Sequence, residues 1–231
     1  YDAVFVGAGI MSSTLAALLH ELDPELNFLM VERLEAPGLE SSAANNNAGT
    51  GHAANCELNY TPLQPDGSVA TAKALAINTA FERSLEFWAS LTAKGKLIPQ
   101  QFLHLVPHIS VVWGDADRAF LAQRYQQLSA LTAFNAMQWS TDSAELAAWM
   151  PLVMEGRVSG EPVAATRMER GTDLDFGVLT GAYLQPLQAC GALEINFASE
   201  VVNLQQHGPR QWHLDLQGPT GIRSVQTPFV F

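Results

Sequence analysis

The chain has 231 residues, of which 48% are hydrophobic and 15% charged, and this composition indicates a globular protein with a substantial apolar core. Its formal net charge of −11 argues against a nucleic-acid partner, because such a partner requires a basic patch. Cys56 and Cys190 form no CxxC pair, and no apolar run reaches the roughly 18 residues of a transmembrane helix, so neither a zinc site nor a membrane span is predicted.

The first predicted elements are a strand, a glycine turn, a helix and a second strand. Apolar residues 3–6 predict a short buried strand, which a Gly-Ala-Gly turn follows at once. Residues 12–22 predict a helix with leucines at i, i+3, i+4 and i+7, and residues 28–31 predict the second strand. This order is typical of a dinucleotide-binding βαβ unit.

Individual residues of this unit suit a dinucleotide. Gly7 permits the sharp turn, and Gly9 lets a pyrophosphate approach the helix N-terminus, where unpaired N–H groups favour an anion. Glu32, at the end of the second strand, can accept hydrogen bonds from ribose hydroxyls, which favours FAD or NAD over NADP. Ser12 replaces the third glycine of the motif, where a small side chain is tolerated. An ordinary βαβ unit with a glycine turn is the alternative interpretation.

Residues 34–59 are rich in Ser, Asn, Gly and Ala and poor in large apolar residues. Such a composition is typical of a surface loop. A long loop inside a compact domain is usually functional, however. Its place after Glu32 is where a bound flavin nucleotide would continue from its adenosine towards its ring.

The middle of the chain predicts helices and short strands. Residues 69–93 predict a long helix whose apolar stripe we interpret as core packing, and residues 117–131 and 142–150 predict helices without a clear chemical signal. Residues 102–114 predict short strands around Pro107. This proline separates His104 from His108, so no two-histidine metal site is predicted, and His108 is more typical of a buried core histidine.

The last third of the chain mixes strands with one helix. Residues 164–180 are polar, and Asp173 and Asp175 would share a face only if this segment were a strand. A helix is predicted at 177–188 and strands at 193–197, 199–204 and 212–216. Residues 227–231 begin like a buried strand and stop without a turn, which predicts a fragment of a longer protein.

These elements predict an α/β fold with a nucleotide-binding domain that is split in sequence. Residues 1–60 and 171–231 would form the FAD-binding domain, and residues 61–170 would form an inserted α+β substrate domain.

Several longer motifs carry a family resemblance. They are SSAANNNAGTGHAANCELNYTP (41–62), VPHISVVWG (106–114), PLVMEG (151–156), VAATR (163–167) and GTDLDFG (171–177). Together with residues 1–17, and in matching order along the whole chain, they resemble bacterial malate:quinone oxidoreductases. The resemblance covers roughly the N-terminal half of that family's length.

The resemblance implies an FAD-dependent enzyme of the glutathione-reductase/amino-acid-oxidase fold type. Such an enzyme oxidises L-malate to oxaloacetate in the tricarboxylic acid cycle and passes the electrons to a membrane quinone rather than to NAD. It would lie in the cytoplasm, peripherally on the inner face of the cell membrane. The oligomeric state is left open.

The resemblance also implies roles for particular residues. Val201 would meet the adenine through its backbone. The full set of expected cofactor-binding residues is Gly7, Gly9, Ser12, Glu32, Arg33, Ser42, Asn46, Asn47, Gly49, Thr50 and Val201. Oxidation of a 2-hydroxy acid also needs a base and a cation for the carboxylates. His52 is the first candidate for the base and His108 the second, and Arg167 is the candidate carboxylate clamp.

Three alternatives remain at this point. A related FAD enzyme could act on another 2-hydroxy acid such as L-2-hydroxyglutarate. An NAD-binding module without flavin chemistry would share the glycine turn, although the Ser/Asn/Gly-rich loop counts against it. A non-catalytic nucleotide-binding fragment is the third.

Overall fold

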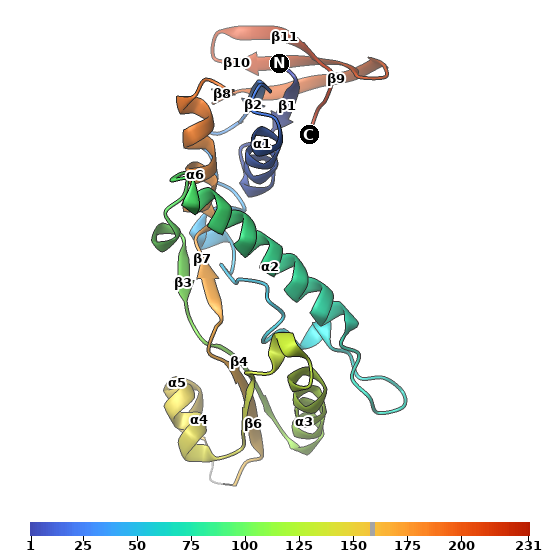
Figure 1. Cartoon of the computed structure of the whole chain (residues 1–231), viewed down its shortest axis with the longest axis vertical. Helices are drawn as coiled ribbons and strands as arrows, with labels where there is room; N and C mark the ends of the chain where they lie inside the picture. The colour runs from blue at the N-terminus through green and yellow to red at the C-terminus, as the bar shows by residue number, and fades with distance from the viewer. Residues whose placement is uncertain (158–159) are drawn as a thin grey trace. The chain divides into compact units, whose positions relative to one another are not determined.

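The computed structural model describes residues 1–157 and 160–231, which divide into two compact units (Figure 1). The first unit holds residues 1–49, 90–103 and 174–231, and the second holds residues 50–89 and 104–173. The sequence prediction placed the boundaries near 60 and 170 and assigned residues 90–103 to the insertion, whereas the contacts group that segment with the first unit.

A parallel sheet forms the centre of the first unit. Its strands are β1 (Ala3–Val6), β2 (Phe28–Val31) and β8 (Leu193–Asn196), in the order β1-β2-β8, and α1 (Ile10–Leu22) connects the first two. These elements confirm the predicted βαβ start. Residues 229–231 run parallel to β1 on its free side, where Val4 N–H donates to the Phe229 carbonyl at 3.0 Å. The resulting order is that of dinucleotide-binding folds.

Both faces of this sheet are buried because apolar side chains occupy every position of its central strand. One face packs on α1 and on α6 (Phe176–Ala189), which lie side by side in Figure 1. The buried residues of that cluster are Ala3, Phe5, Ala8, Ala16, Phe28, Met30, Leu184, Leu187 and Leu193. The alternate side chains Val4, Leu29 and Val31 pack with Leu214 and Leu216 on the other face.

Leu214 and Leu216 belong to an antiparallel sheet that covers this second face. Its strands are β9 (Glu200–Gly208), β10 (Gln211–Gly218) and β11 (Gly221–Thr227), in the order β11-β10-β9. The first two confirm the strands predicted near 199–204 and 212–216. The sequence prediction missed β11, because most of its side chains are polar and exposed and so show no apolar alternation.

The second unit is built on an antiparallel sheet with helices on both faces. The strands are β4 (His108–Trp113), β5 (Gln138–Ser140) and β6 (Val163–Met168), in the order β4-β6-β5. Val112 and Ala164 pack with Leu121 of α3 (Asp115–Ser129) on one face. Val163 and Ala165 pack on the other face with α4 (Ser143–Trp149) and α5 (Pro151–Met154).

The remaining elements link these cores. Helix α2 (Ala72–Ala93) crosses from the second unit to the first, and β3 (Leu103–Leu105) pairs with β7 (Thr172–Leu174). Short 3-10 turns lie at Ala44–Asn46, Leu58–Tyr60, Pro99–Gln101 and Thr132–Phe134. Within residues 1–157 and 160–231, no helix is both long enough and apolar enough to cross a membrane.

The two aspartates of the 164–180 segment do not share a strand face. β7 ends at Leu174, and the side chain of Asp175 instead caps α6 by accepting from the Val178 N–H at 2.9 Å. Asp173 is exposed. The loop interpretation is therefore correct for Asp175, which serves helix initiation.

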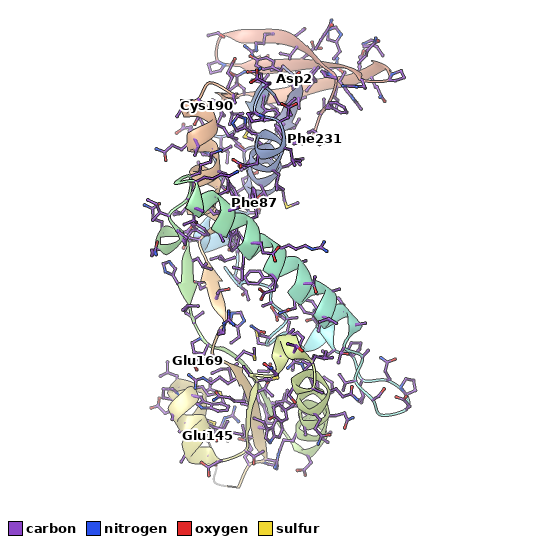
Figure 2. All side chains as sticks on the ribbon, viewed as in Figure 1. Asp2, Phe87, Glu145, Glu169, Cys190 and Phe231 are labelled. Atoms are coloured by element: carbon purple, nitrogen blue, oxygen red, sulfur yellow. The ribbon has the colours of Figure 1, made fainter. Side chains whose placement is uncertain are left out.

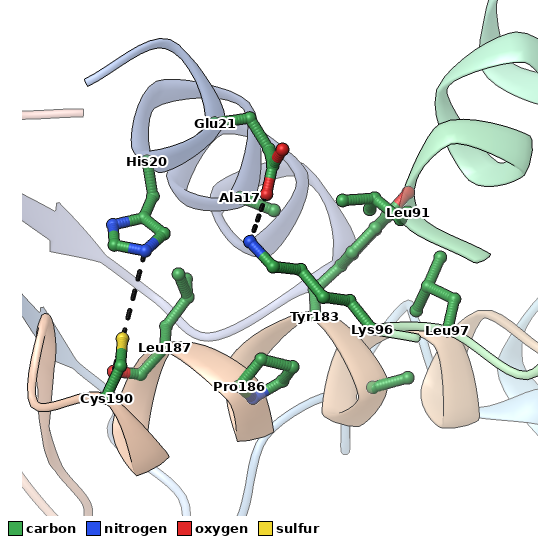
Figure 3. Close-up of a pocket in the computed structure, with 11 residues that line it drawn as sticks. Ala17, His20, Glu21, Leu91, Lys96, Leu97, Tyr183, Pro186, Leu187 and Cys190 are labelled. Atoms are coloured by element: carbon green, nitrogen blue, oxygen red, sulfur yellow. Dashed lines mark hydrogen bonds and ion pairs between the residues drawn. The ribbon is translucent and has the colours of Figure 1, made fainter. Parts of the chain in front are cut away.

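A pocket of about 100 Å³ lies in the first unit between the C-terminal half of α1, α6 and residues 91–97 (Figure 3). Glu21 forms ion pairs beside it with Lys94 and Lys96. Burial alone would raise the pKa of Glu21, but the two lysines outweigh it and hold that pKa below its ordinary value. These pairs attach residues 94–96 to α1.

Replacing Glu21 with Gln tests this attachment. We expect Glu21→Gln to lower the free energy of unfolding at pH 7 by at most about 1 kcal/mol, because the lysines are partly exposed. A carboxyl group whose pKa is lowered in the folded state stabilises the fold at pH values above its ordinary pKa. This stabilisation is lost as the pH falls through the folded-state pKa. Thermal unfolding at pH 7 and at a series of lower pH values measures the effect, which should shrink as the pH falls below the ordinary carboxyl pKa. The exposed Glu25→Gln is the control, and an equal loss in both variants contradicts the assignment.

Candidate functional site

The N-terminus of α1 in the first unit has the form of an anion cradle. Gly7 has a φ of +96°, which permits the turn that brings the chain from β1 into the helix. The N-cap residue Gly9 offers no side-chain cap, and no acidic residue lies in the first turn. Ser42 lies against this turn: its hydroxyl accepts from the Ile10 N–H at 3.0 Å.

Glu32 joins the glycine turn to the loop that follows β2. Its carboxylate is almost fully buried, and its Oε2 accepts from the Ala8 N–H at 2.7 Å while its Oε1 accepts from the Leu34 N–H at 2.8 Å. Each carboxylate oxygen has a second lone pair, which is free to accept a ribose hydroxyl. Arg33 instead forms an exposed ion pair with Glu40.

The asparagines of the polar loop use their side-chain amides to hold the loop itself. Asn46 Nδ2 donates to the Glu40 carbonyl at 2.8 Å. Asn47 Nδ2 donates to the Ser41 and Ala43 carbonyls, and its Oδ1 accepts from the Gly49 N–H at 2.8 Å. These bonds shape the loop, so contacts of Asn46 and Asn47 with a cofactor would use their backbone groups or remaining lone pairs.

The remaining expected cofactor residues lie in different parts of the structure. Ser12 is half-buried in the first turn of α1, as a small residue in the third glycine position should be. Val201 lies in β9, opposite Leu216 at a bulge. Thr50 belongs to the second unit, where it bridges to Asp173.

The geometry of the first unit fits a dinucleotide. The helix N-terminus, whose N-cap residue has no side chain, suits a pyrophosphate, and the carboxylate at the end of β2 suits a ribose. Both lie at the carboxyl ends of parallel strands, next to the point where the strand order reverses between β1 and residues 229–231. This edge of such sheets is where ligands bind.

A second cluster of chemical groups surrounds His52 in the second unit. His52 Nδ1 lies 3.2 Å from Glu57 Oε1 and 3.5 Å from Tyr60 Oη. The histidine side chain is 57% exposed and the glutamate side chain only 16% exposed. The arrangement therefore presents an accessible imidazole backed by a largely buried carboxylate.

The loop between His52 and Glu57 is fixed through its carbonyls. Those of residues 53–56 each accept a side-chain hydrogen bond, from Asn78 for Ala53, from Arg124 for Ala54 and Asn55, and from Ser110 for Cys56. Ala54 has a φ of +59°, an uncommon conformation for a residue other than glycine. Such strain persists where the surroundings over-determine the backbone, and it often marks a functional site.

Arg124 is the largest fully buried side chain of the described residues. Its Nε donates to Thr61 Oγ1 at 2.9 Å, and its Nη2 donates to the Asn55 carbonyl at 3.1 Å. Burial lowers the pKa of Arg124 to about 10, with Cys56 and Glu57 acting in the opposite direction, so the guanidinium remains charged at neutral pH. Burial, together with Glu57, raises the pKa of the Cys56 thiol to about 11, so this thiol stays protonated.

His108, the second candidate base, is buried in the second unit. Its Nε2 accepts from the Thr172 N–H at 3.1 Å, and a Cβ added to Gly171 would lie 2.3 Å from its ring. This environment is that of a packed core histidine, which favours His52 as the base.

Arg167, the candidate carboxylate clamp, is not brought together with His52. It pairs with Ile109 across β4 and β6, forms an ion pair with Glu169 at 2.6 Å and lies over the Trp149 ring of α4. Glu169 is labelled at the end of β6 in Figure 2. Neighbouring strand positions point to opposite faces, and Ser110, which anchors the His52 loop, lies on the α3 face.

Glu57, Tyr60 and Arg124 were missed in the sequence. The helix predicted at 117–131 showed no clear chemical signal, yet Arg124 lies between Leu121 and Leu128 on its buried stripe. A charged residue at a core position of an amphipathic helix was the available signal. Glu57 and Tyr60 gave no signal in the sequence, because only the fold of the loop brings them to His52.

The sequence matches one protein family over its whole length. The family model of malate:quinone oxidoreductases (Mqo) matches residues 1–231. A probable malate:quinone oxidoreductase of Prochlorococcus marinus strain MIT 9313 is 80% identical over 100% of this chain and 47% of its own length. One of Synechococcus sp. strain RCC307 is 68% identical, over 100% and 48%. The chain thus spans about half the length of the curated relatives it matches.

Solved structures share the fold at low sequence identity. Glycine oxidase from Geobacillus kaustophilus is 16% identical with a TM-score of 0.66, over 100% of this chain and 54% of that one. L-α-glycerophosphate oxidase from Mycoplasma pneumoniae, solved with FAD bound, is 16% identical with a TM-score of 0.61, over 99% and 52%. The similarity supports the predicted fold type.

Removing the Ser42 hydroxyl tests how the cradle is held. Ser42→Ala leaves the Ile10 N–H at the start of α1 without its acceptor, so we expect a loss of about 1 kcal/mol in the free energy of unfolding. Urea titration followed by circular dichroism measures it. Ser41→Ala, at the exposed neighbour, should have little effect, and comparable losses in the two variants would refute the capping role.

Proposed function

We propose, from the premise that this chain belongs to the malate:quinone oxidoreductase family, that it provides the FAD-binding part and the base of an enzyme that oxidises L-malate to oxaloacetate. The electrons would pass to a quinone, as in the tricarboxylic acid cycle. The proposal extends to a protein of the relatives' full length, about twice that of this chain.

The α1 N-terminus with Glu32 is the observation that carries the proposal. Gly7, Gly9 and the first turn of α1 would hold the pyrophosphate, and Glu32 would hold the ribose of the adenosine. The loop shaped by Ser42, Asn46 and Asn47 would follow the flavin chain, together with the remaining cofactor residues Ser12, Arg33, Gly49, Thr50 and Val201. Bound FAD would supply the acceptor for the hydride that leaves malate C2.

His52 is the residue we propose to take the proton from the malate C2 hydroxyl. Its ring is accessible, and its Nδ1 faces a carboxylate, which leaves Nε2 for the substrate. A histidine suits this transfer because its ordinary pKa lies near neutral pH. Arg167 remains a candidate for the malate carboxylates, although it lies on the opposite sheet face from the anchor of the His52 loop.

We also propose a peripheral membrane location on the cytoplasmic side. The proposal is supported by the family's quinone acceptor, which is a lipid-phase molecule, together with the lack of a helix able to span a membrane in the described ranges.

An absorbance spectrum before and after anaerobic addition of L-malate tests the function. We expect the purified protein, at the full length of its relatives, to show a flavin spectrum that bleaches with malate. A flavin spectrum that malate leaves unchanged would move the substrate to another hydroxy or amino acid. Absence of flavin from the folded protein would refute the proposal and favour the NAD-binding interpretation.

Replacing His52 with Ala tests the assigned base. In the same full-length protein we expect the malate-dependent rate of flavin reduction at pH 7 to fall by about 100-fold or more, with FAD still bound. His104→Ala, at an exposed histidine of β3, is the control and should keep the wild-type rate. A His52→Ala protein that holds FAD and reacts at nearly the wild-type rate would exclude His52 as the base.

A further inference from the structure

We infer that Glu57 is a positioning residue for His52, because its carboxylate faces Nδ1 of the imidazole and so favours the tautomer that presents the lone pair of Nε2 to the substrate hydroxyl. The inference rests on the proposed function and adds a second residue to it. The contact that carries it is the 3.2 Å approach of Glu57 Oε1 to His52 Nδ1, and this buried oxygen accepts no hydrogen bond from the described residues, so it is available to the imidazole.

The chemistry of the pair follows from the two ring nitrogens. A neutral imidazole carries one proton, and a carboxylate at Nδ1 selects the tautomer that keeps it there. When Nε2 takes the hydroxyl proton, the ring becomes positively charged, and the facing carboxylate stabilises that charge. Nothing is consumed at Glu57, since the proton stays on the histidine.

The backbone between the two residues is rigid enough for this role. Side chains of α2, α3 and β4 bind the four carbonyls of residues 53–56, and Ala54 is held in the left-handed region. These contacts therefore hold Glu57 beside His52 in one conformation of the loop. A preorganised support of this kind is what a proton-transfer group requires.

Four other side chains make up the electrostatic surroundings of the pair. The buried Arg124 guanidinium acts on Glu57 electrostatically, and the neighbouring Cys56 thiol is neutral because its pKa is raised to about 11. Tyr60 Oη approaches the same Nδ1 at 3.5 Å, and Lys73 of α2 lies over the Tyr60 ring. Glu57 is the acidic side chain that faces the imidazole.

A purely structural role for Glu57 must be separated from this one. Glu57 Oε2 also accepts from the Cys56 N–H at 3.3 Å, so its loss could disturb the loop without touching the chemistry. Glu57→Gln keeps the size and the accepting oxygen while removing the charge. Glu57→Asp keeps the charge on a shorter side chain, and Glu82→Gln, at an exposed position of α2, is the matched control.

Two measurements on the purified full-length protein with ¹⁵N-labelled histidine form the test. The ring-nitrogen shifts of His52 report which nitrogen carries the proton, and they do not depend on turnover. The pH profile of malate-dependent flavin reduction reports the reaction. Circular dichroism and thermal unfolding verify that each variant is folded.

We expect Glu57→Gln to change the His52 ring shifts and to lower kcat by about 10-fold with little change in KM. The acid limb of the pH profile should move to lower pH, because the protonated ring loses its counter-charge. Glu57→Asp should recover part of the rate, and Glu82→Gln should match the wild type in both measurements.

Other results would overturn the inference. Ring shifts that are the same in the wild type and Glu57→Gln would refute the pairing. Changed shifts with a wild-type rate and pH profile would show that the pair does not serve the reaction. If malate does not reduce the flavin of the wild-type protein, the proposed function and the catalytic part of this inference are refuted. The ring-nitrogen shifts would then still decide whether Glu57 pairs with His52.

Discussion

Buried backbone groups need hydrogen-bond partners, and in this chain side chains supply those partners to the two segments that carry the candidate chemistry. In the first unit, Glu32 and Ser42 accept the N–H groups of the glycine turn and of the start of α1. In the second unit, Arg124 donates to the carbonyls of the His52 loop. Neither segment belongs to a sheet ladder, so each depends on these few side chains for its shape.

Holding the loop with buried side chains costs folding free energy, and Arg124 shows this most clearly. A guanidinium without exposed surface loses its hydration, and the resulting penalty is only partly offset by neutral acceptors and by the charge of Glu57. An apolar residue would fill the same space more cheaply but would leave the Ala54 and Asn55 carbonyls unsatisfied. The buried cation thus favours one conformation of the loop over maximal stability.

Local sequence patterns predicted the elements that form by local rules. The strand at 3–6, the helix near 12–22 and the strand at 28–31 follow from apolar periodicity and a glycine turn, and the structure confirms them. Strand β11 was not predicted, because its mostly exposed polar residues show no alternation of apolar and polar side chains. The Arg124 contacts were not predicted for another reason: they join a loop to a helix more than 60 positions away, and no periodicity records such a contact.

The two cysteines of the chain differ in accessibility. The Cys56 thiol lies within the His52 loop, with its pKa raised to about 11, whereas Cys190 is exposed at the end of α6, 3.8 Å from His20 (Figure 3). A thiolate, rather than a thiol, reacts with alkylating reagents, so a mild reagent at neutral pH distinguishes the two positions. A fluorophore or spin label can therefore be attached at Cys190 without engineering, which turns the α1–α6 face of the first unit into a built-in reporter.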